Sequence, residues 1–346
     1  MIEIRSLGPA DDRALDAFLH ERDEHWLYPS PVFRDFLRQI VPGDPVTLAA
    51  CRQGRIEGVL PFFVASNPDL GAIVNSQPWY GSHGGCTLAR PEDHEARVAL
   101  LEAYQAHCRR VNAAASTMIL SPFEQAQVQT YQRVLSPQLT DDRVGQVSIL
   151  PSGPAEEDVI LQSYRQKTRN LVRKSLKQEL ELVVSDDDAM WSFLYETHLE
   201  NMQAVGGRAK PRAHFDAMRS TIPPQRRRLY VARSQGRCVA AMLLFLFHRT
   251  VEYITPVIKV EHRHMQPLSF LIHHATRDAV RDGYLYWNWG GTWRTQESLH
   301  HFKAGWGAHD MPYTYLVNVT PESRDHIRAN LPEYQRAFPF YYLVPF

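Results

Sequence analysis

An apolar run from Val239 to Phe247 lies between two strand-like segments, Arg228 to Arg233 and Val251 to Pro256. The run is much shorter than the ~20 residues that a helix needs to cross a bilayer, so it predicts a buried strand and no membrane span. Short connections such as Gln235-Gly236 join the three segments into a predicted meander. A helix from Pro267 to Gly283 follows, with proline in its first turn.

Two helices are predicted before this meander and one further strand after it. The helices are expected from Glu156 to Gln178 and from Asp187 to Val205, and the strand from Tyr286 to Trp289. The resulting order is helix, helix, three strands, helix and strand. It predicts an α/β (α+β) fold in which a mixed central sheet is flanked by helices.

The first part of the chain repeats this order in a weaker form. Residues Val46 to Val64 predict a hairpin around Gln53-Gly54. Two prolines and a glycine in Leu150-Pro151-Ser152-Gly153-Pro154 interrupt any continuing element. We therefore expect two tandem domains of similar fold, residues 1–150 and 151–346, as a chain of this length also favours.

Composition narrows the classes of function. Lys plus Arg and Asp plus Glu both number 38, so the formal net charge is zero. A neutral chain does not rely on broad electrostatic attraction to nucleic acid or to an anionic membrane. The cysteines are scattered without C-x-x-C spacing, and the N-terminal segment lacks the apolar core of a signal peptide. These features predict a cytoplasmic protein in a reducing compartment.

The segment after the last predicted strand combines glycines, aromatic residues and one lysine. The strand runs into a Gly290-Gly291 turn, and Phe302-Lys303-Ala304-Gly305-Trp306 predicts the opening of a helix. Glycine lets the backbone approach a ligand closely. A lysine between Phe302 and Trp306 would be partly desolvated, and a fixed cation of this kind stabilises the oxyanion of acyl transfer. A surface lysine near a helix start is the alternative interpretation.

The helix expected from Glu156 carries a cluster of cations. Arg165, Arg169 and Arg173 are four residues apart and would share one helix face. Because guanidinium groups bind phosphate in a bidentate manner, this face predicts a site for a phosphate-bearing ligand. A solvated charged face is the alternative.

A loop in the first domain, Ser76 to Gly85, is dense in glycines, aromatic residues and hydrogen-bonding groups. Loops of this composition commonly line pockets. The residues that we expect to line substrate, here and at the glycine turn above, are Trp79, Tyr80, Gly84, Gly85, Gly290 and Gly291. His83 is a candidate general base, since histidine titrates nearest to neutrality. A plain structural turn fits the loop equally well.

Two of these segments resemble the Fem family of aminoacyl and acyl transferases within the GNAT superfamily. One is the glycine turn followed by Phe302-Lys303 and an aromatic-glycine pair, and the other is the basic stretch from Lys167 to Lys174. The resemblance implies tandem GNAT-like domains and transfer of an acyl group to an amine. It also implies that Lys303 lies at the reacting centre. The residues that it assigns to acceptor phosphates are Lys167, Arg169 and Arg173.

The resemblance limits the substrates without fixing them. The segment Lys259 to Gln266 holds no glycine, whereas GNAT enzymes bind the CoA pyrophosphate there with a glycine-rich loop. The implied donor is therefore aminoacyl-tRNA, or acyl-CoA or acyl carrier protein, with no tightly bound cofactor. The implied acceptor is a small-molecule or lipid-linked, phosphate-bearing precursor of the cell envelope, of the peptidoglycan or nucleotide-sugar type. His262 and His264 lack a third ligand at a workable spacing, so no metal is expected.

Two other functions fit the same residues. One is acyl-CoA-dependent N-acetyl transfer to a small amine. The other is a non-catalytic protein that keeps the fold and binds a phosphorylated ligand.

Overall fold

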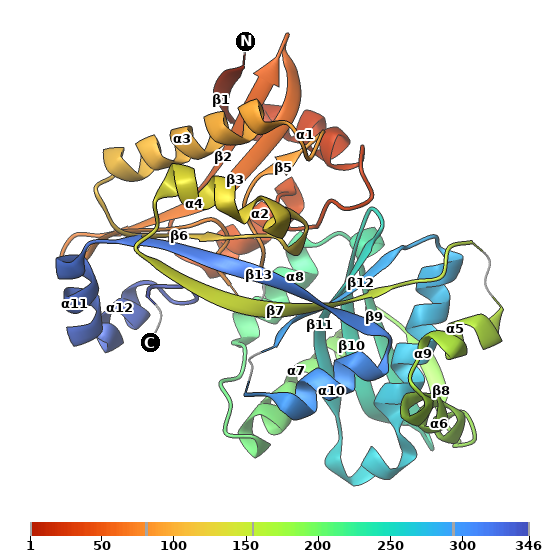
Figure 1. The fold of residues 1–346 in the computed structure, drawn as a ribbon. Coiled ribbons are helices and arrows are strands. Elements are labelled where there is room, and N and C mark those ends of the chain that lie inside the picture. The colour runs from red at the N-terminus through yellow and green to blue at the C-terminus, as the bar shows by residue number, and fades with distance from the viewer. Residues whose placement is uncertain (1, 80–81, 154–155, 293–294, 345–346) are drawn as a thin grey trace. The chain divides into compact units, whose positions relative to one another are not determined.

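The computed structural model describes residues 2–79, 82–153, 156–292 and 295–344 (Figure 1). The chain forms two compact units, Met1–Val144 together with Met311–Phe346, and Gly145–Asp310. Each unit combines sheet strands with helices, so the predicted α/β fold class is confirmed.

The first unit is built on a mixed sheet. Its strands are β1 (Glu3–Leu7), β2 (Asp44–Arg52), β3 (Arg55–Asn67), β4 (Gly71–Asn75), β5 (Thr87–Leu88), β6 (Ala113–Ile119) and the part of β13 (Ala308–Val319) that begins at Met311. The order is β1-β2-β3-β4-β6-β13, with β5 paired to β3; among the described pairs of this unit, β4 and β6 run parallel and the others antiparallel. The predicted hairpin is confirmed, because β2 and β3 pair around Gln53 and Gly54, which both have positive φ as a tight turn requires.

Helices of the first unit cover its sheet, and both faces are buried, since the consecutive residues Leu48 to Cys51 of β2 are all buried. The helices are α1 (Asp12–Leu19), α2 (Pro31–Ile40), α3 (His94–Arg110), α4 (Val128–Leu135), α11 (Pro321–Ala329) and α12 (Leu331–Ala337). Helix α3 lies along β2 and β3 (Figure 1), where Leu100 and Tyr104 join Leu60 and Phe62 in one apolar core. Burial of such side chains is the main favourable term in folding.

The second unit also contains strands that pair in both parallel and antiparallel directions. Its strands are the part of β7 (Leu139–Ile149) that begins at Gly145, β8 (Glu181–Val184), β9 (Arg227–Ser234), β10 (Arg237–Phe247), β11 (Thr250–Ile258) and β12 (Tyr286–Thr292). The order is β7-β12-β11-β10-β9-β8. Strands β9, β10 and β11 form the predicted antiparallel meander, and β12 joins β11 in parallel. The apolar run from Val239 to Phe247 is buried throughout.

Six helices complete the described part of the second unit. They are α5 (Glu157–Ser163), α6 (Gln166–Ser175), α7 (Asp188–Ala204), α8 (Arg212–Thr221), α9 (Pro267–Arg281) and α10 (Glu297–Gly305). Side chains of α6 and α9, including Val172 and Leu271, pack with Met242 and Leu244 of β10 in one core. Helix α7 packs against β10 and β11. Across the described residues of both units, no helix is both long and apolar enough to cross a membrane.

The basic helix differs from its prediction. The expected helix from Glu156 to Gln178 is broken into α5 and α6, because Tyr164 and Arg165 have extended backbone with ψ of 151° and 153°. Tertiary contacts cause the break: the backbone N–H of Arg165 donates to Gly305 O at 2.9 Å. Arg165 therefore precedes α6 and does not share a helix face with Arg169 and Arg173.

The two units also divide the chain differently from the predicted domains 1–150 and 151–346. Residues 311–346 group with the first unit, because β13 pairs with β6 from Tyr315↔Ile119 to Val319↔Ala115. Helices α11 and α12 follow β13 in that unit. A boundary read from prolines and glycines cannot detect such a return of the chain.

Candidate active site

Lys303 lies on α10 with its side chain buried in the second unit, at 4% exposure. Its Nζ donates hydrogen bonds to Gly290 O (3.1 Å), Gly291 O (3.0 Å) and Thr292 Oγ1 (2.8 Å). These three acceptors match the three N–H donors of an ammonium group. Helix α10 thus holds a cation against the end of β12.

The glycine pair belongs to a strand and not to the turn that the sequence predicts. Gly290 and Gly291 are the fifth and sixth residues of β12. Gly290 has a φ of +73°, which a residue with a side chain adopts only under strain. Its N–H donates to Asn288 Oδ1 at 2.8 Å. The strand therefore changes direction at Gly290 and turns its carbonyl oxygens toward Lys303.

Strands β11 and β12 stay paired over a short distance only. Their registered pairs run from Thr250↔Tyr286 to Glu252↔Asn288, although both strands continue beyond the last pair. At that pair, Asn288 Nδ2 donates to the buried Glu252 Oε2 at 2.8 Å. The strands then part at their carboxyl ends, where sheets with parallel strands commonly bind ligands.

Burial sets the electrostatics of Lys303. It lowers the pKa of the ammonium group from 10.5 to about 8, because the charged form loses its water. Among the described residues no carboxylate forms an ion pair with it. Thr292 Oγ1 donates in turn to Gln146 Oε1 at 3.0 Å, and Gln146 Nε2 donates to His300 O at 3.2 Å. This buried network orients the acceptors around Lys303.

The glycines after Lys303 allow α5 and α6 to pack closely on α10. A Cβ at Gly305 would lie 2.4 Å from Thr168 Oγ1, and a Cβ at Gly307 would lie 2.5 Å from Ser163 O. Between them, the Trp306 ring packs edge-on against Tyr164 at 4.9 Å. The two segments that resemble the Fem family are therefore in direct contact.

Two of the three predicted phosphate-binding residues share a groove. Arg169 and Arg173 line a cavity of about 390 Å³ on α6, together with Asp158 and Gln166. Arg169 is partly engaged, since its Nη1 donates to Tyr164 O at 2.7 Å. Arg173 is exposed and has no ion-pair partner among the described residues. Lys167 is also exposed on α6 but does not line this groove.

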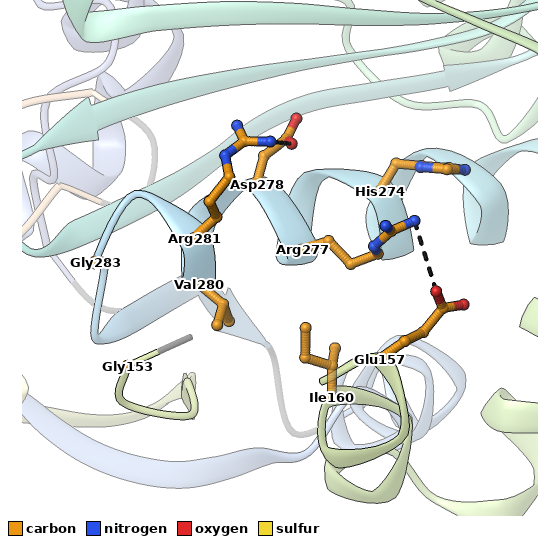
Figure 2. Close-up of a pocket in the computed structure, with 9 residues that line it drawn as sticks. All are labelled: Gly153, Glu157, Ile160, His274, Arg277, Asp278, Val280, Arg281 and Gly283. Atoms are coloured by element: carbon orange, nitrogen blue, oxygen red, sulfur yellow. Dashed lines mark ion pairs between the residues drawn. The ribbon is translucent and has the colours of Figure 1, made fainter. Parts of the chain in front are cut away.

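A second groove in the same unit, of about 440 Å³, runs beside α9 (Figure 2). It also contains two arginines, but carboxylates neutralise them. Arg281 Nη1 lies 2.8 Å from Asp278 Oδ1, and Arg277 Nη1 lies 3.8 Å from Glu157 Oε2 (Figure 2). An anion would have to displace these partners, so the groove on α6 is better suited to phosphate.

His83 lies in the first unit, inside an aromatic cage. Its ring is 4.6 Å from that of Tyr313 and 5.4 Å from that of Tyr28, in edge-on contacts, and 6.3 Å from that of Trp26. Only 2% of the residue is exposed, and burial lowers its pKa to about 4. Its Nδ1 has no hydrogen-bond partner among the described residues. The imidazole is thus neutral near pH 7.

The predicted substrate loop of the first unit is largely buried. The Trp79 ring packs edge-on against Phe36 at 5.1 Å. A Cβ at Gly84 would lie 2.3 Å from Ser76 Oγ, and Gly85 has a φ of +81°. Packing and backbone conformation therefore account for these glycines. Tyr80 lies outside the described residues.

The structure adds polar residues that the sequence patterns did not single out. They are Gln146, Glu252 and Asn288 around the end of β12, and Lys210, whose amine donates to Ile254 O of β11. Asn288 lies within the predicted strand from Tyr286 to Trp289, but nothing in its sequence neighbourhood indicated a buried partner on another strand. Within the described ranges no group of three His, Cys, Asp or Glu residues could hold a metal ion.

Comparison with known proteins shows which protein family the second unit resembles. Residues 162–304 match the family model of the acetyltransferase (GNAT) domain. The match lies within the second unit, and it spans α6, the meander, β12 and Lys303. Over these residues the second unit is therefore similar to a GNAT acetyltransferase domain. None of the curated protein sequences compared with the chain matches it significantly.

Solved structures extend the likeness to the whole chain. The crystal structure of FemX is similar over 96% of this chain and 99% of its own, with a TM-score of 0.74 and 14% identity. A tandem GNAT protein from the clavulanic acid biosynthesis pathway covers 92% of this chain and 98% of its own, with a TM-score of 0.53 and 13% identity. The chain thus has a Fem-like tandem GNAT fold, as predicted.

A further neighbour is the C-terminal domain of a putative lysylphosphatidylglycerol synthetase from Agrobacterium fabrum. The similarity covers 92% of this chain and 95% of that domain, with a TM-score of 0.58 and 12% identity. At such identities the likeness concerns the fold alone.

Proposed function

We propose that the protein is an N-acyltransferase that moves an acyl or aminoacyl group to an amine of a phosphate-bearing acceptor. The observation that carries the proposal is the buried ammonium group of Lys303 where β11 and β12 part. Attack of an amine on an acyl carbonyl creates an oxyanion, and a fixed cation stabilises it. The effect is large because a buried charge is poorly screened.

The contacts of Lys303 define how it would act. All three of its N–H donors are occupied by Gly290, Gly291 and Thr292. Lys303 therefore acts through its charge, and it also fixes the end of β12. The proposed mechanism does not use His83, whose imidazole is neutral near pH 7 and enclosed by aromatic rings.

The groove of Arg169 and Arg173 is the proposed acceptor site. Two guanidinium groups on one helix face suit a phosphate or pyrophosphate. Lys167 would add charge from the side of the groove. The acceptor would be a small or lipid-linked cell-envelope precursor, such as a peptidoglycan or nucleotide-sugar intermediate. The similarity to FemX and to a lysylphosphatidylglycerol synthetase domain supports this class.

The segment before α9 bears on the donor. Residues Val260–Met265 form a 3-10 turn, in which the N–H groups of His262 and Gln266 donate to Lys259 O and Arg263 O. Pro267 has no N–H group to offer. This backbone arrangement supports a donor that needs no pyrophosphate-binding loop here, such as an aminoacyl-tRNA or an acyl carrier protein. The proposed reaction takes place in the cytoplasm. The GNAT family match favours a second candidate, acyl-CoA-dependent acetylation of a small amine.

A transfer assay with paired donors and acceptors tests the proposal. Donors would be an aminoacyl-tRNA, acyl carrier protein and acyl-CoAs, and acceptors would be UDP-linked muramyl peptides, amino sugars and phosphatidylglycerol. Lys303→Met should lower kcat by roughly 10²- to 10³-fold with little change in ligand affinity. Arg173→Ala should weaken the acceptor and not the donor, and the exposed Lys177→Met is the control.

The outcomes separate the candidates. Full activity of Lys303→Met would refute its assigned role. Transfer from acetyl-CoA to a simple amine, with none to a phosphate-bearing acceptor, would favour the second candidate. Tight binding of a phosphorylated ligand without transfer from any donor would identify a non-catalytic binding protein.

A further inference from the structure

Lys210 is a second lysine of the second unit whose pKa is lowered by burial, and the mechanism above does not use it. It lies in the segment between α7 and α8, half-buried, with its amine against β11. Its Nζ donates to Ile254 O at 3.1 Å and to Thr255 Oγ1 at 2.9 Å. Its backbone N–H donates to His198 Nε2 at 2.9 Å, which ties the segment to α7.

The carbonyl group of Ile254 is available to Lys210 because of a β-bulge. Leu243 pairs with Thr255 whereas Leu244 pairs with Tyr253, so Ile254 is the extra residue on β11. The extra residue of a bulge is left out of the hydrogen-bonded ladder. On the other side of β11, the pairing with β12 has already ended.

Lys210 and Lys303 donate hydrogen bonds to matching positions on the two strands that part. The last registered pair is Glu252↔Asn288. Two residues beyond it on β11, Ile254 O accepts from Lys210, and two residues beyond it on β12, Gly290 O accepts from Lys303. One lysine amine is thus anchored on each strand at the point where the strands diverge.

The hydrogen bonds of the two amines differ in number. Lys303 has three acceptors, as the three donors of an ammonium group require. Lys210 has two acceptors within the described part of the chain. A neutral amine has two N–H donors and one lone pair, so these contacts satisfy neutral Lys210 and leave its lone pair unoccupied.

The surroundings of Lys210 destabilise its charged form. Burial lowers its pKa from 10.5 to about 8. The titratable groups around it are His198 from α7, His214 from α8 and Arg208 from its own segment. The pKa of both histidines is lowered to about 4. Burial is the larger cause and the charge of Lys210 the smaller, so neither histidine carries charge near pH 7. On β11 the nearest carboxylate in sequence is Glu252, whose Oε2 accepts from Asn288.

We propose that Lys210 is the proton acceptor of the acyl transfer, an inference that rests on the proposed function. The amine nitrogen of the acceptor forms a C–N bond to the acyl carbon, and the carbonyl π electrons move onto oxygen beside Lys303. The nitrogen, now an ammonium, gives its proton to the lone pair of Lys210 Nζ. The bond from carbon to the donor's leaving atom then breaks, and the leaving group departs with that electron pair. Protonated Lys210 returns its proton to the leaving group or to solvent.

Two substitutions test this role by kinetics. Lys210→Ala removes the base, and Lys210→Arg keeps a cation and its donors but cannot accept a proton near neutrality. Both should lower kcat on the order of 10²-fold or more. A tertiary amine, which cannot itself be acylated stably, should restore turnover to Lys210→Ala and increasingly so with its basicity. Restoration of activity by arginine would show a purely electrostatic or structural role and overturn the proposal.

A second readout does not depend on activity. Lysine-selective ¹³Cε labelling allows each lysine to be titrated by NMR, with Lys210→Arg used to assign the signal. A Lys210 signal that titrates near pH 8 agrees with the proposal, whereas titration near pH 10.5 would overturn it. Wild-type inactivity toward every donor and acceptor pair would overturn the proposed function and this inference together. Wild-type transfer with undiminished turnover of Lys210→Ala would overturn this inference alone.

Discussion

Replacing Lys303 with methionine should stabilise the protein near neutral pH or destabilise it only slightly. The difference in unfolding free energy between the wild type and this variant should change with pH in a defined direction. Methionine keeps the length of the side chain but removes the charge that burial disfavours. It also leaves the oxygen atoms of Gly290, Gly291 and Thr292 without their donor. These effects oppose each other, so the sign of the stability change at one pH is less informative than its trend with pH.

The trend follows from the pKa shift. The pKa of Lys303 is about 8 in the folded protein against 10.5 for the ordinary side chain. Between these values the unfolded chain binds more protons than the folded protein, so stability rises with pH. The penalty for burying the charge is fully present below pH 8 and is relieved as pH rises toward 10.5. Linkage gives about 2 kcal/mol of relief between pH 7 and pH 9.5.

Urea unfolding followed by tryptophan fluorescence measures this trend. The free energy of unfolding of the wild type, minus that of Lys303→Met, should rise by about 2 kcal/mol between pH 7 and pH 9.5. Other titrating groups are present in both proteins and cancel in the difference. Lys177→Met, at an exposed position, controls for the loss of a lysine. A difference that stays flat or falls with pH would refute the view that Lys303 is a buried, desolvated cation.

Three further predictions concern packing and charge. Gly84→Ala should destabilise the first unit by about 1–3 kcal/mol, because its Cβ would lie 2.3 Å from Ser76 Oγ. Gly8→Ala is the control: its Cβ has open space, so its unfolding free energy in the same urea titration should be nearly unchanged. Gly305→Ala should lower the unfolding free energy by a similar amount, because its Cβ would clash with Thr168 Oγ1. Adding Thr168→Ala should recover part of this loss, and simple additivity of the two changes would disprove the contact. Arg97→Met leaves the carboxylate of Glu124 buried without its 3.0 Å partner and should cost about 3–5 kcal/mol. Loss of the partly exposed Arg90–Glu57 pair should cost about 1 kcal/mol or less, and equal costs for the two pairs would contradict this account.

The regular elements could be predicted because short-range rules decide them. The run from Val239 to Phe247 is apolar throughout and too short for a membrane helix, so a buried strand was the remaining choice. Gln53-Gly54 supplies the positive φ values of a tight hairpin turn. Pro267 starts a helix because its fixed φ suits a first turn and its missing N–H is not needed there.

Prediction from local pattern failed at positions where contacts between residues far apart in sequence determine the structure. Nothing between Glu156 and Gln178 forbids a continuous helix, but the Arg165 N–H bonds to Gly305, far away in sequence, and the helix breaks there. Residues 311–346 return to the first unit through a strand pairing that no local pattern indicates. The registered pairs of a sheet are a property of two segments, so neither segment predicts them alone.

The sequence by itself determined the fold class and the segment that carries Lys303, because periodicity, prolines and glycines act over a few neighbouring residues. It did not determine the state of the lysines. Lys303 and Lys210 become unusual only when carbonyl groups and a threonine hydroxyl from other segments surround them and exclude water. Burial is a property of the packed chain, and it is burial that lowers the pKa of a lysine. The tertiary structure therefore decided which of the six lysines in this chain could take part in chemistry.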